Sequence, residues 1–325
     1  MHKLLHFIKT AAVAVAVFAP TVAEAQLVSL FTQYNEMQSF INPAALSGDF
    51  LQYQQNAVAS LLYRRQWASI EDAPQTGLAR FEYIMEGNSL SSFGGFLFKD
   101  KIGASNVQGF YGRYAYHLRP STNADILFGM GITAGLLQYR IKPQELEFEV
   151  GDQLQGNSQT DWVPDFNLGA SFTYFPQQGV KFYTGVSVPQ VARTRAKFDA
   201  EGNRKFALSR PSHLSLTAGA VIPVGQQGFL EPSIWVKGAS GQPVNIDFNI
   251  RQKFVNNFWM GIGYGTARTL HVEAGAILTK WLNLQNGLLR IGGGYDYNIG
   301  GYGSQLGNTY EIVINYAFRA SRKNK

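Results

Sequence analysis

The stretch that decides the fold is residues 309–318, which read TYEIVINYAF near the C-terminal end of the chain. Every even-numbered position from Tyr310 to Phe318 is aromatic or aliphatic, whereas the odd-numbered positions include Glu311 and Asn315. A period of two places the two sets on opposite faces of a β-strand. Aromatic residues bracket an aliphatic centre, which is typical of a strand that crosses a membrane between two aromatic girdles.

The same alternation recurs along the chain. In residues 291–299, apolar positions such as Tyr295 alternate with glycine and polar positions such as Asp296, and residues 244–251 follow the same rule. The alternating runs predict about fourteen strands, whose boundaries are approximate when read from sequence. Their ranges are 56–66, 76–86, 89–99, 104–118, 124–141, 163–175, 179–189, 212–224, 228–237, 244–253, 257–266, 269–279, 288–299 and 309–318.

The connections between these strands are sorted by length. Long, charged connections mostly follow odd-numbered strands, as at 142–162 and 190–211, and short ones mostly follow even-numbered strands, as at 87–88 and 225–227. The exceptions are the long connection at 279–287 and the short one at 267–268. Outer-membrane barrels have short turns on one side and long loops on the other. We therefore predict an all-β chain that forms a transmembrane antiparallel up-and-down β-barrel in the cell outer membrane, with both termini periplasmic. A soluble sandwich would also alternate, but it gives no reason for sorted loops.

The N-terminus has the features of a secretory signal peptide. Lys3 and Lys9 precede a short apolar run, and Ala23-Glu24-Ala25 forms a cleavage site. The run is too short to span a membrane as a helix. We divide the chain into a signal peptide at 1–25, an N-terminal periplasmic or plug segment at 26–55, a barrel at 56–318 and a basic tail at 319–325.

The composition narrows the function further. The chain has no cysteine, which fits an oxidising compartment and removes thiolate metal sites. It has 28 basic and 22 acidic residues, but the signal peptide and the tail hold much of the excess, so we do not expect nucleic-acid binding. No two histidines have the spacing of metal ligands. We expect no catalytic residue, no metal and no cofactor.

A motif follows the predicted cleavage site. Thr32-Gln33-Tyr34 is followed by Asn42-Pro43-Ala44 and then by Gly48. This resembles the start of the PorP/SprF family of type IX secretion membrane proteins, which reads (S/T)-Q-Y and then N-P-A with a nearby glycine. The resemblance implies a non-enzymatic outer-membrane barrel of the type IX secretion or gliding apparatus. It further implies that the barrel anchors, or helps secrete and present, a large cell-surface protein. The implied partners are that protein or an adhesin C-terminal domain, other secretion components and outer-membrane lipid.

The segment that carries the motif is expected to enter the barrel as a plug. Asn42-Pro43 favours a reversal of the chain, because the residue before proline is held extended. We expect Tyr34 and Phe40 to anchor the segment in the lumen, and Gln33 and Asn42 to bond to polar groups there. The alternative is a disordered lead-in to the first strand.

Charged residues of both signs fall on the predicted lumen face of the strands. Such a mixture suits an interior braced by ion pairs, whereas a pore tuned for one ion sign would show one sign in excess. These residues are Arg113, Glu231, Lys237, Asp247, Arg251, Glu273, Arg290, Asp296 and Glu311.

Two predicted outer loops differ in charge. Acidic residues of the loop at 142–162 are Glu145, Glu147 and Glu149. Basic residues of the loop at 190–211 are Arg193, Arg195, Lys197, Arg204 and Lys205. The loops could clasp each other over the mouth or could dock an exported partner, and we favour docking because long loops on a rigid barrel are where binding usually occurs.

A second class of function stays open at this point. A barrel of this size lies between filled eight-stranded barrels and open porins, so a porin or a transporter of small solutes, including hydrophobic ones, is the alternative. A barrel-embedded lipid enzyme is weaker, because no nucleophile can be placed beside His271 and Glu273 from the sequence.

Overall fold

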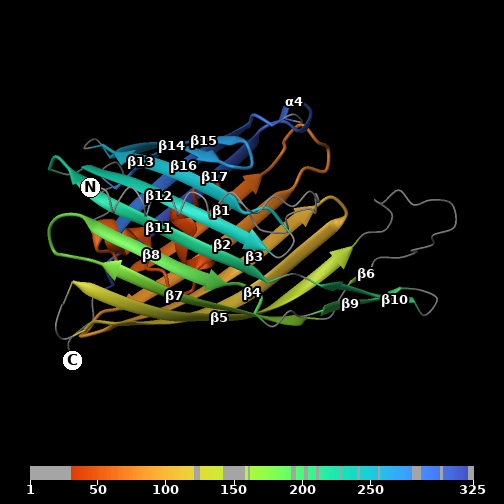
Figure 1. The fold of residues 1–325 in the computed structure, drawn as a ribbon, viewed down its shortest axis with the longest axis horizontal. Helices are drawn as coiled ribbons and strands as arrows, with labels where there is room; N and C mark the ends of the chain where they lie inside the picture. Colours follow the sequence, from red (N-terminus) through yellow and green to blue (C-terminus); the bar gives the residue numbers. More distant parts are fainter. Residues whose placement is uncertain are drawn as a thin grey trace, which may run out of the picture.

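The computed structural model describes most of the chain from residue 31 onward. The described residues are 31–120, 125–141, 158–159, 162–191, 195–200, 204–209, 212–226, 228–239, 242–254, 257–279, 287–300 and 303–320. Fourteen strands form one closed antiparallel barrel (Figure 1). The predicted fold class is confirmed, and each predicted strand corresponds to one strand of the barrel.

The barrel strands are named in chain order. The first seven are β1 (Ala57–Arg65), β2 (Gln75–Met85), β3 (Leu90–Ile102), β4 (Ser105–Leu118), β5 (Ile126–Ile141), β7 (Val163–Tyr174) and β8 (Lys181–Val188). The remaining seven are β11 (His213–Val224), β12 (Gly228–Ala239), β13 (Asn245–Lys253), β14 (Phe258–Gly265), β15 (Thr269–Ile277), β16 (Gly287–Asn298) and β17 (Thr309–Phe318).

The barrel closes where its first and last strands pair. Ala57 lies opposite Phe318, and Arg65 lies opposite Tyr310. The start of β1 and the end of β17 are therefore at the same end of the barrel, which we call the short-turn rim. The other end, where β1 ends and β17 begins, is the long-loop rim, because the long connections 142–162 and 189–212 leave the barrel there.

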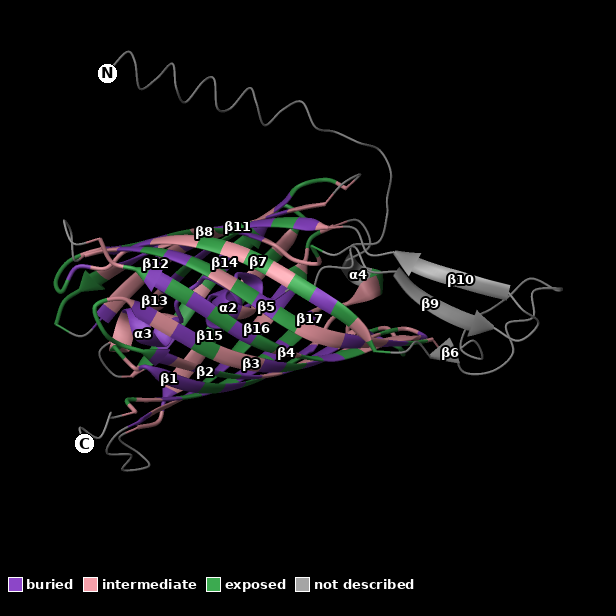
Figure 2. Cartoon of the chain, turned by 90° about the horizontal axis from the view of Figure 1, so that it is seen from below, coloured by how far each residue is buried: buried purple, intermediate pink, exposed green. Residues whose placement is uncertain are grey.

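The two faces of the wall are those that the alternation predicts. Along β17, Glu311 and Asn315 are buried while Tyr310 and Ile312 are exposed. Figure 2 shows the same alternation of buried and exposed residues along neighbouring strands. Large hydrophobic side chains are exposed on the outside of most barrel strands, as with Ile262. An apolar outer band of this extent is the surface that lipid covers in a membrane barrel.

Three further strands of the described residues lie outside the barrel, in connections that we expected to be loops. Ser158–Gln159 (β6) adds to the end of β5, and Arg195–Ala200 (β9) pairs with Arg204–Ser209 (β10) as a separate two-stranded sheet. The loop predicted at 190–211 therefore contains a hairpin of its own. A short helix, α4 (Gly303–Leu306), precedes β17. Among the described residues, no helix is long and apolar enough to cross a membrane.

Candidate functional site

The chain ahead of β1 lies in the lumen of the barrel. Residues 31–55, which we call the plug segment, contain a 3-10 turn η1 (Tyr34–Met37) and the short helices α2 (Gln38–Ile41) and α3 (Gly48–Tyr53). Nearly all of residues 31–51 are buried, and α2 and α3 lie within the outline of the barrel in Figure 2. Polar groups of the plug segment form hydrogen bonds and ion pairs with polar side chains of the lumen wall.

Glu36 is the most heavily bonded residue of the plug segment. Its carboxylate forms ion pairs with Arg251 of β13 and Arg290 of β16, the latter at 2.8 Å, and accepts a hydrogen bond from Asn315 of β17 at 2.7 Å. Asp49 forms a second ion pair with Arg290, at 2.6 Å. One carboxylate on η1 therefore ties the plug segment to three strands of the wall.

Burial and nearby charge act on these two carboxyl groups in opposite senses. Burial opposes ionisation of Glu36, but the adjacent charges of Arg290 and Arg251 outweigh it and hold the pKa of Glu36 at about 2. For Asp49, burial dominates over the attraction of Arg290, and its pKa is raised. The charge of Glu36 is therefore favoured by its two arginine partners, and this charge contributes to holding the plug segment in place.

A second cluster holds the beginning of the plug segment. Arg64 of β1 forms ion pairs with Asp296 at 2.7 Å and with Glu311 at 3.2 Å. It also donates to the Thr32 hydroxyl at 2.6 Å, and that hydroxyl donates to Asp296 at 2.7 Å. The backbone N–H groups of Thr32 and Gln33 donate to the two oxygens of Glu311, at 3.0 and 2.8 Å. The cluster thus joins the plug segment to the strands at which the barrel closes.

A third cluster holds the middle of the plug segment against β2 and β4. Arg113 donates to the backbone carbonyls of Pro43 at 2.7 Å and Ala45 at 2.6 Å, and pairs with Glu82 at 3.2 Å. Ser39 donates to the same carboxylate of Glu82. These carbonyls lie in a turn, where no helix or strand could satisfy them, so the guanidinium takes the place of a backbone partner.

The Asn42-Pro43 reversal fits into a part of the wall that has no side chains. The Asn42 amide donates to the Ala170 carbonyl at 3.1 Å, and its oxygen accepts from the Ala44 N–H at 2.9 Å. A Cβ on Gly131 would lie 2.4 Å from the Pro43 carbonyl carbon, and one on Gly169 would lie 2.0 Å from the Asn42 oxygen. Glycine is required at both positions because the plug backbone passes so close.

Aromatic side chains hold the segment as well. The Tyr34 hydroxyl bonds to Ser233 at 2.8 Å, and the Phe40 ring lies 5.6 Å from Phe31 and from Phe96. The expectation for Gln33 is wrong in its detail. Its backbone N–H bonds to the wall, whereas its side-chain amide makes no hydrogen bond with any described residue and packs over Gly292, where a Cβ would lie 2.5 Å from its oxygen.

The nine charged residues expected to line the lumen are all buried. Sequence reasoning did not select Arg64, Arg80 or Glu82 of the wall, nor Glu36 and Asp49 of the plug segment, although all five belong to the clusters. Arg80 does so through an ion pair with Glu82 at 2.6 Å and a hydrogen bond to Ser39 at 2.9 Å. The alternation of the three wall residues with outward apolar residues in β1 and β2 was a usable signal for them. Gly48, the last residue of the motif, begins α3.

The outer-loop residues are placed only in part. Arg195 and Lys197 lie on β9, and Arg204 and Lys205 lie on β10. Arg193 and the acidic residues Glu145, Glu147 and Glu149 lie outside the described residues. Within the described part of the chain, no group of three or more histidine and carboxylate side chains is arranged to hold a metal ion.

A closed antiparallel barrel with an apolar outer band defines the class of outer-membrane β-barrel proteins. The chain belongs to the family described as type IX secretion system membrane protein PorP/SprF, whose model matches residues 23–316.

Solved structures share the fold at low sequence identity. The Ralstonia pickettii toluene transporter TbuX is 11% identical, with a TM-score of 0.51 over 88% of this chain and 94% of that one. The monoaromatic hydrocarbon channel CymD is 10% identical, with a TM-score of 0.51 over 91% and 95%. A Pseudomonas aeruginosa FadL homologue is 8% identical, with a TM-score of 0.50 over 87% and 94%. Among curated proteins, none matches this sequence.

Proposed function

We propose that this protein is a closed outer-membrane barrel that anchors, or helps secrete and present, a large cell-surface protein exported by the type IX system. The observation that carries the proposal is the plug segment, which bonds to strands on all sides of the lumen. Because the plug segment occupies the lumen, we infer that this barrel works through its surfaces. Membership of a type IX secretion family supports exported protein as the partner.

The orientation follows from the sorted connections. We infer that the short-turn rim, where the barrel begins at Ala57 and ends at Phe318, faces the periplasm, because short turns face that side in outer-membrane barrels. The long-loop rim then faces outward. The partner would meet the basic hairpin of β9 and β10 and the acidic connection at 142–162 there, and other secretion components would reach the periplasmic side.

The alternative is a porin or a transporter of small solutes. The fold is shared with proteins described as a toluene transporter and a monoaromatic hydrocarbon channel. At 11% and 10% identity the likeness is one of fold alone. A barrel that conducts would have to move the plug segment, which its ion pairs oppose.

The test is capture of the exported partner by a barrel with an altered outer surface. Replacing Arg193, Arg195 and Lys197 together by glutamine removes charge from the long-loop rim. We expect a large secreted protein to co-purify near stoichiometrically with the wild type in mild detergent, as measured by mass spectrometry, and to be lost from this variant. Electrostatic complementarity of exposed charges governs such encounters.

The matched control neutralises the same number of charges on the other side of the molecule. Replacing Arg322, Lys323 and Lys325 by glutamine removes three charges from the basic tail and keeps the bonds of Arg319 to Gln54 and Glu86, so capture should be unaffected. Equal capture by the wild type and both variants would refute docking through the basic hairpin. A barrel that purifies alone from native membrane would refute the anchoring role itself.

A further inference from the structure

A cavity lies between the plug segment and the barrel wall near the long-loop rim. Its volume is about 100 Å³. It is placed near this rim because Asp165 stands at the start of β7, His213 begins β11, and Pro189 directly follows β8. Glu36, Arg113 and their ion-pair partners do not line this cavity.

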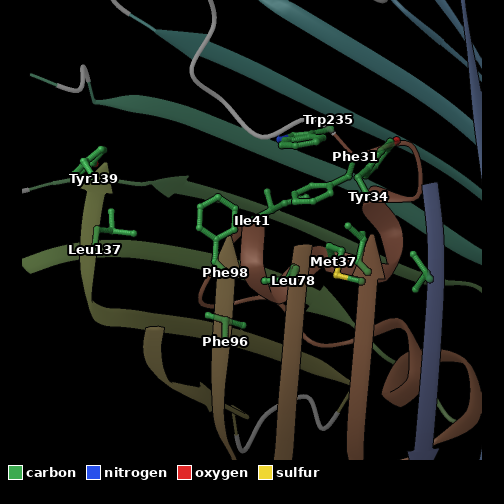
Figure 3. Packing of buried hydrophobic residues seen from close by; sticks show 12 residues of the cluster. Phe31, Tyr34, Met37, Ile41, Leu78, Phe96, Phe98, Leu137, Tyr139 and Trp235 are labelled. Atoms are coloured by element: carbon green, nitrogen blue, oxygen red, sulfur yellow. The ribbon is translucent and has the colours of Figure 1, made fainter. Parts of the chain in front are cut away.

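The plug segment supplies one side of the cavity, with Phe31, Phe40 and Ile41. The wall supplies the other side with the rings of Phe96 and Phe98 on β3, Tyr111 on β4 and Trp235 on β12. Figure 3 shows Phe31, Ile41, Phe98 and Trp235 converging from these separate elements. The cavity is therefore lined mainly by aromatic rings, and these rings are fixed by other contacts.

Ring-to-ring packing holds the lining in shape. Phe40 lies 5.6 Å from Phe96 and 5.8 Å from Phe98, and Phe96 lies 6.4 Å from Tyr111. The Trp235 indole N–H donates to Ser215 at 2.7 Å. Because these side chains are already positioned, a ligand would not have to order them on binding, which is the condition for affinity from a small contact area.

The charged side chains Asp165 and Lys237 of the lining have partners within the protein. The Tyr111 hydroxyl donates to Asp165 at 2.7 Å, and Lys237 forms an ion pair with Asp247. An anionic or cationic ligand would therefore enter without a free counter-charge, and burying an unpaired charge is costly. An uncharged ligand meets no such penalty.

We propose that this cavity is a binding site for a single uncharged aromatic ring. A dry cavity of about 150 Å³ lined by aliphatic and aromatic side chains holds one benzene molecule. The volume here, about 100 Å³, is of the same order, so we take one ring as the largest ligand that the cavity accepts. Surrounding rings offer the edge-to-face and offset contacts that aromatic pairs prefer.

The proposal does not rest on the anchoring function, since the cavity exists whether or not a partner binds. One ring could come from a free small molecule or from a phenylalanine or tyrosine side chain of the exported partner. Both sources present the same chemistry to Phe31, Phe40 and Trp235.

The test is photoaffinity labelling of the full-length mature barrel with phenyl azide, followed by peptide mapping. We expect labels in residues 31–41, 96–111 and 213–237, with excess toluene suppressing them and benzoate not. Site-resolved mapping separates the cavity from detergent that dissolves the probe. Labels spread over outward residues such as Phe182 and Phe248, or labels that toluene does not compete, would overturn the proposal.

Two variants make the test specific. Ile41→Phe fills the cavity from the plug side and keeps the Ile41 carbonyl that accepts from Ser187 at 2.8 Å, so labelling should fall about tenfold or more. The matched control, Ile262→Phe, makes the same change on the outer face and should leave labelling unchanged. Phe40→Ala enlarges the cavity and should admit naphthyl azide, which the wild type excludes. Equal labelling of the wild type and Ile41→Phe would refute the site.

The same experiment on barrel co-purified with its partner distinguishes the two sources. Protection from phenyl azide in the complex would identify a side chain of the partner as the ring, and labelling of both forms would identify a free molecule. If no partner co-purifies, labelling of the barrel alone still tests the cavity. Failure of the anchoring role and failure of this site therefore give different results.

Discussion

Replacing Glu36 by glutamine tests whether the plug segment is held by ion pairs. The substitution keeps the shape of the side chain but removes the charge that pairs with Arg251 and with Arg290, and it weakens the bond from Asn315. Both arginines then lose one of their carboxylate partners inside the lumen. We expect the plug segment to leave its site more often and the barrel wall to stay folded.

The magnitude follows from what the two arginines keep. Arg251 retains Glu273 at 2.8 Å, and Arg290 retains Asp49 at 2.6 Å, so neither charge is left alone. Breaking a buried pair by removing one partner costs about 3–5 kcal/mol, and the retained partners favour the lower end, about 3 kcal/mol. At about 1.4 kcal/mol per factor of ten, the fraction of molecules with a released plug segment should rise about 150-fold.

The assay is limited proteolysis of the mature barrel in detergent, with the rate of cleavage within residues 31–55 as the readout. When opening is fast relative to cleavage, that rate follows the population of the open form. The matched control is Glu86→Gln, which breaks the exposed pair with Arg319 at 3.1 Å and should change stability by about 0–1 kcal/mol. A cleavage rate for Glu36→Gln close to that of the control would refute the role of the ion pairs.

Three further outcomes follow from the same contacts. Gly131→Ala places a Cβ against the Pro43 backbone and should destabilise the bound plug segment by about 1–3 kcal/mol. The control is Gly293→Ala, whose Cβ meets nothing within 4 Å and which should have no such effect. Equal rates of proteolysis for the two variants would contradict the close approach of the plug backbone to Gly131. Asn42→Ala removes a buried bond to the wall and should speed cleavage by about fivefold, or about 1 kcal/mol, as read by the same assay. Because the pKa of Glu36 is about 2, below its ordinary 4.5, its stabilisation is present above pH 4.5 and is lost as the pH falls through about 2. Pepsin should therefore cut the plug segment faster at pH 2 than at pH 4, relative to an unfolded standard, and a constant ratio would contradict this.

The barrel was predictable because its signal is local. In residues 309–318 the polarity of each side chain indicates whether it faces the lumen or the outside of the barrel. The register with β1 then follows from closure of the barrel. The lengths of the connections likewise distinguished the short-turn rim from the long-loop rim. The hairpin of β9 and β10 was missed because its short strands lie inside a connection that reads as a charged loop.

The bonding of the plug segment was less predictable because its partners are distant in the sequence. Asn42-Pro43 marks a reversal wherever it occurs, but only the folded barrel shows that Gly131 and Gly169 leave room for it. Glu36 and Arg290 are 254 positions apart, and the sequence around either residue does not indicate its partner. The sequence therefore predicted a charged lumen and a plug, but not which charges meet.

Conductance across a planar lipid bilayer tests the closed lumen most directly. The full-length mature chain should give no steady conductance, because residues 31–55 occupy the lumen and are bonded to the wall around it. The chain lacking residues 31–55, as the matched control, should conduct if its barrel forms. Steady conductance by the full-length chain, equal to that of the shortened one, would contradict the account and favour a porin.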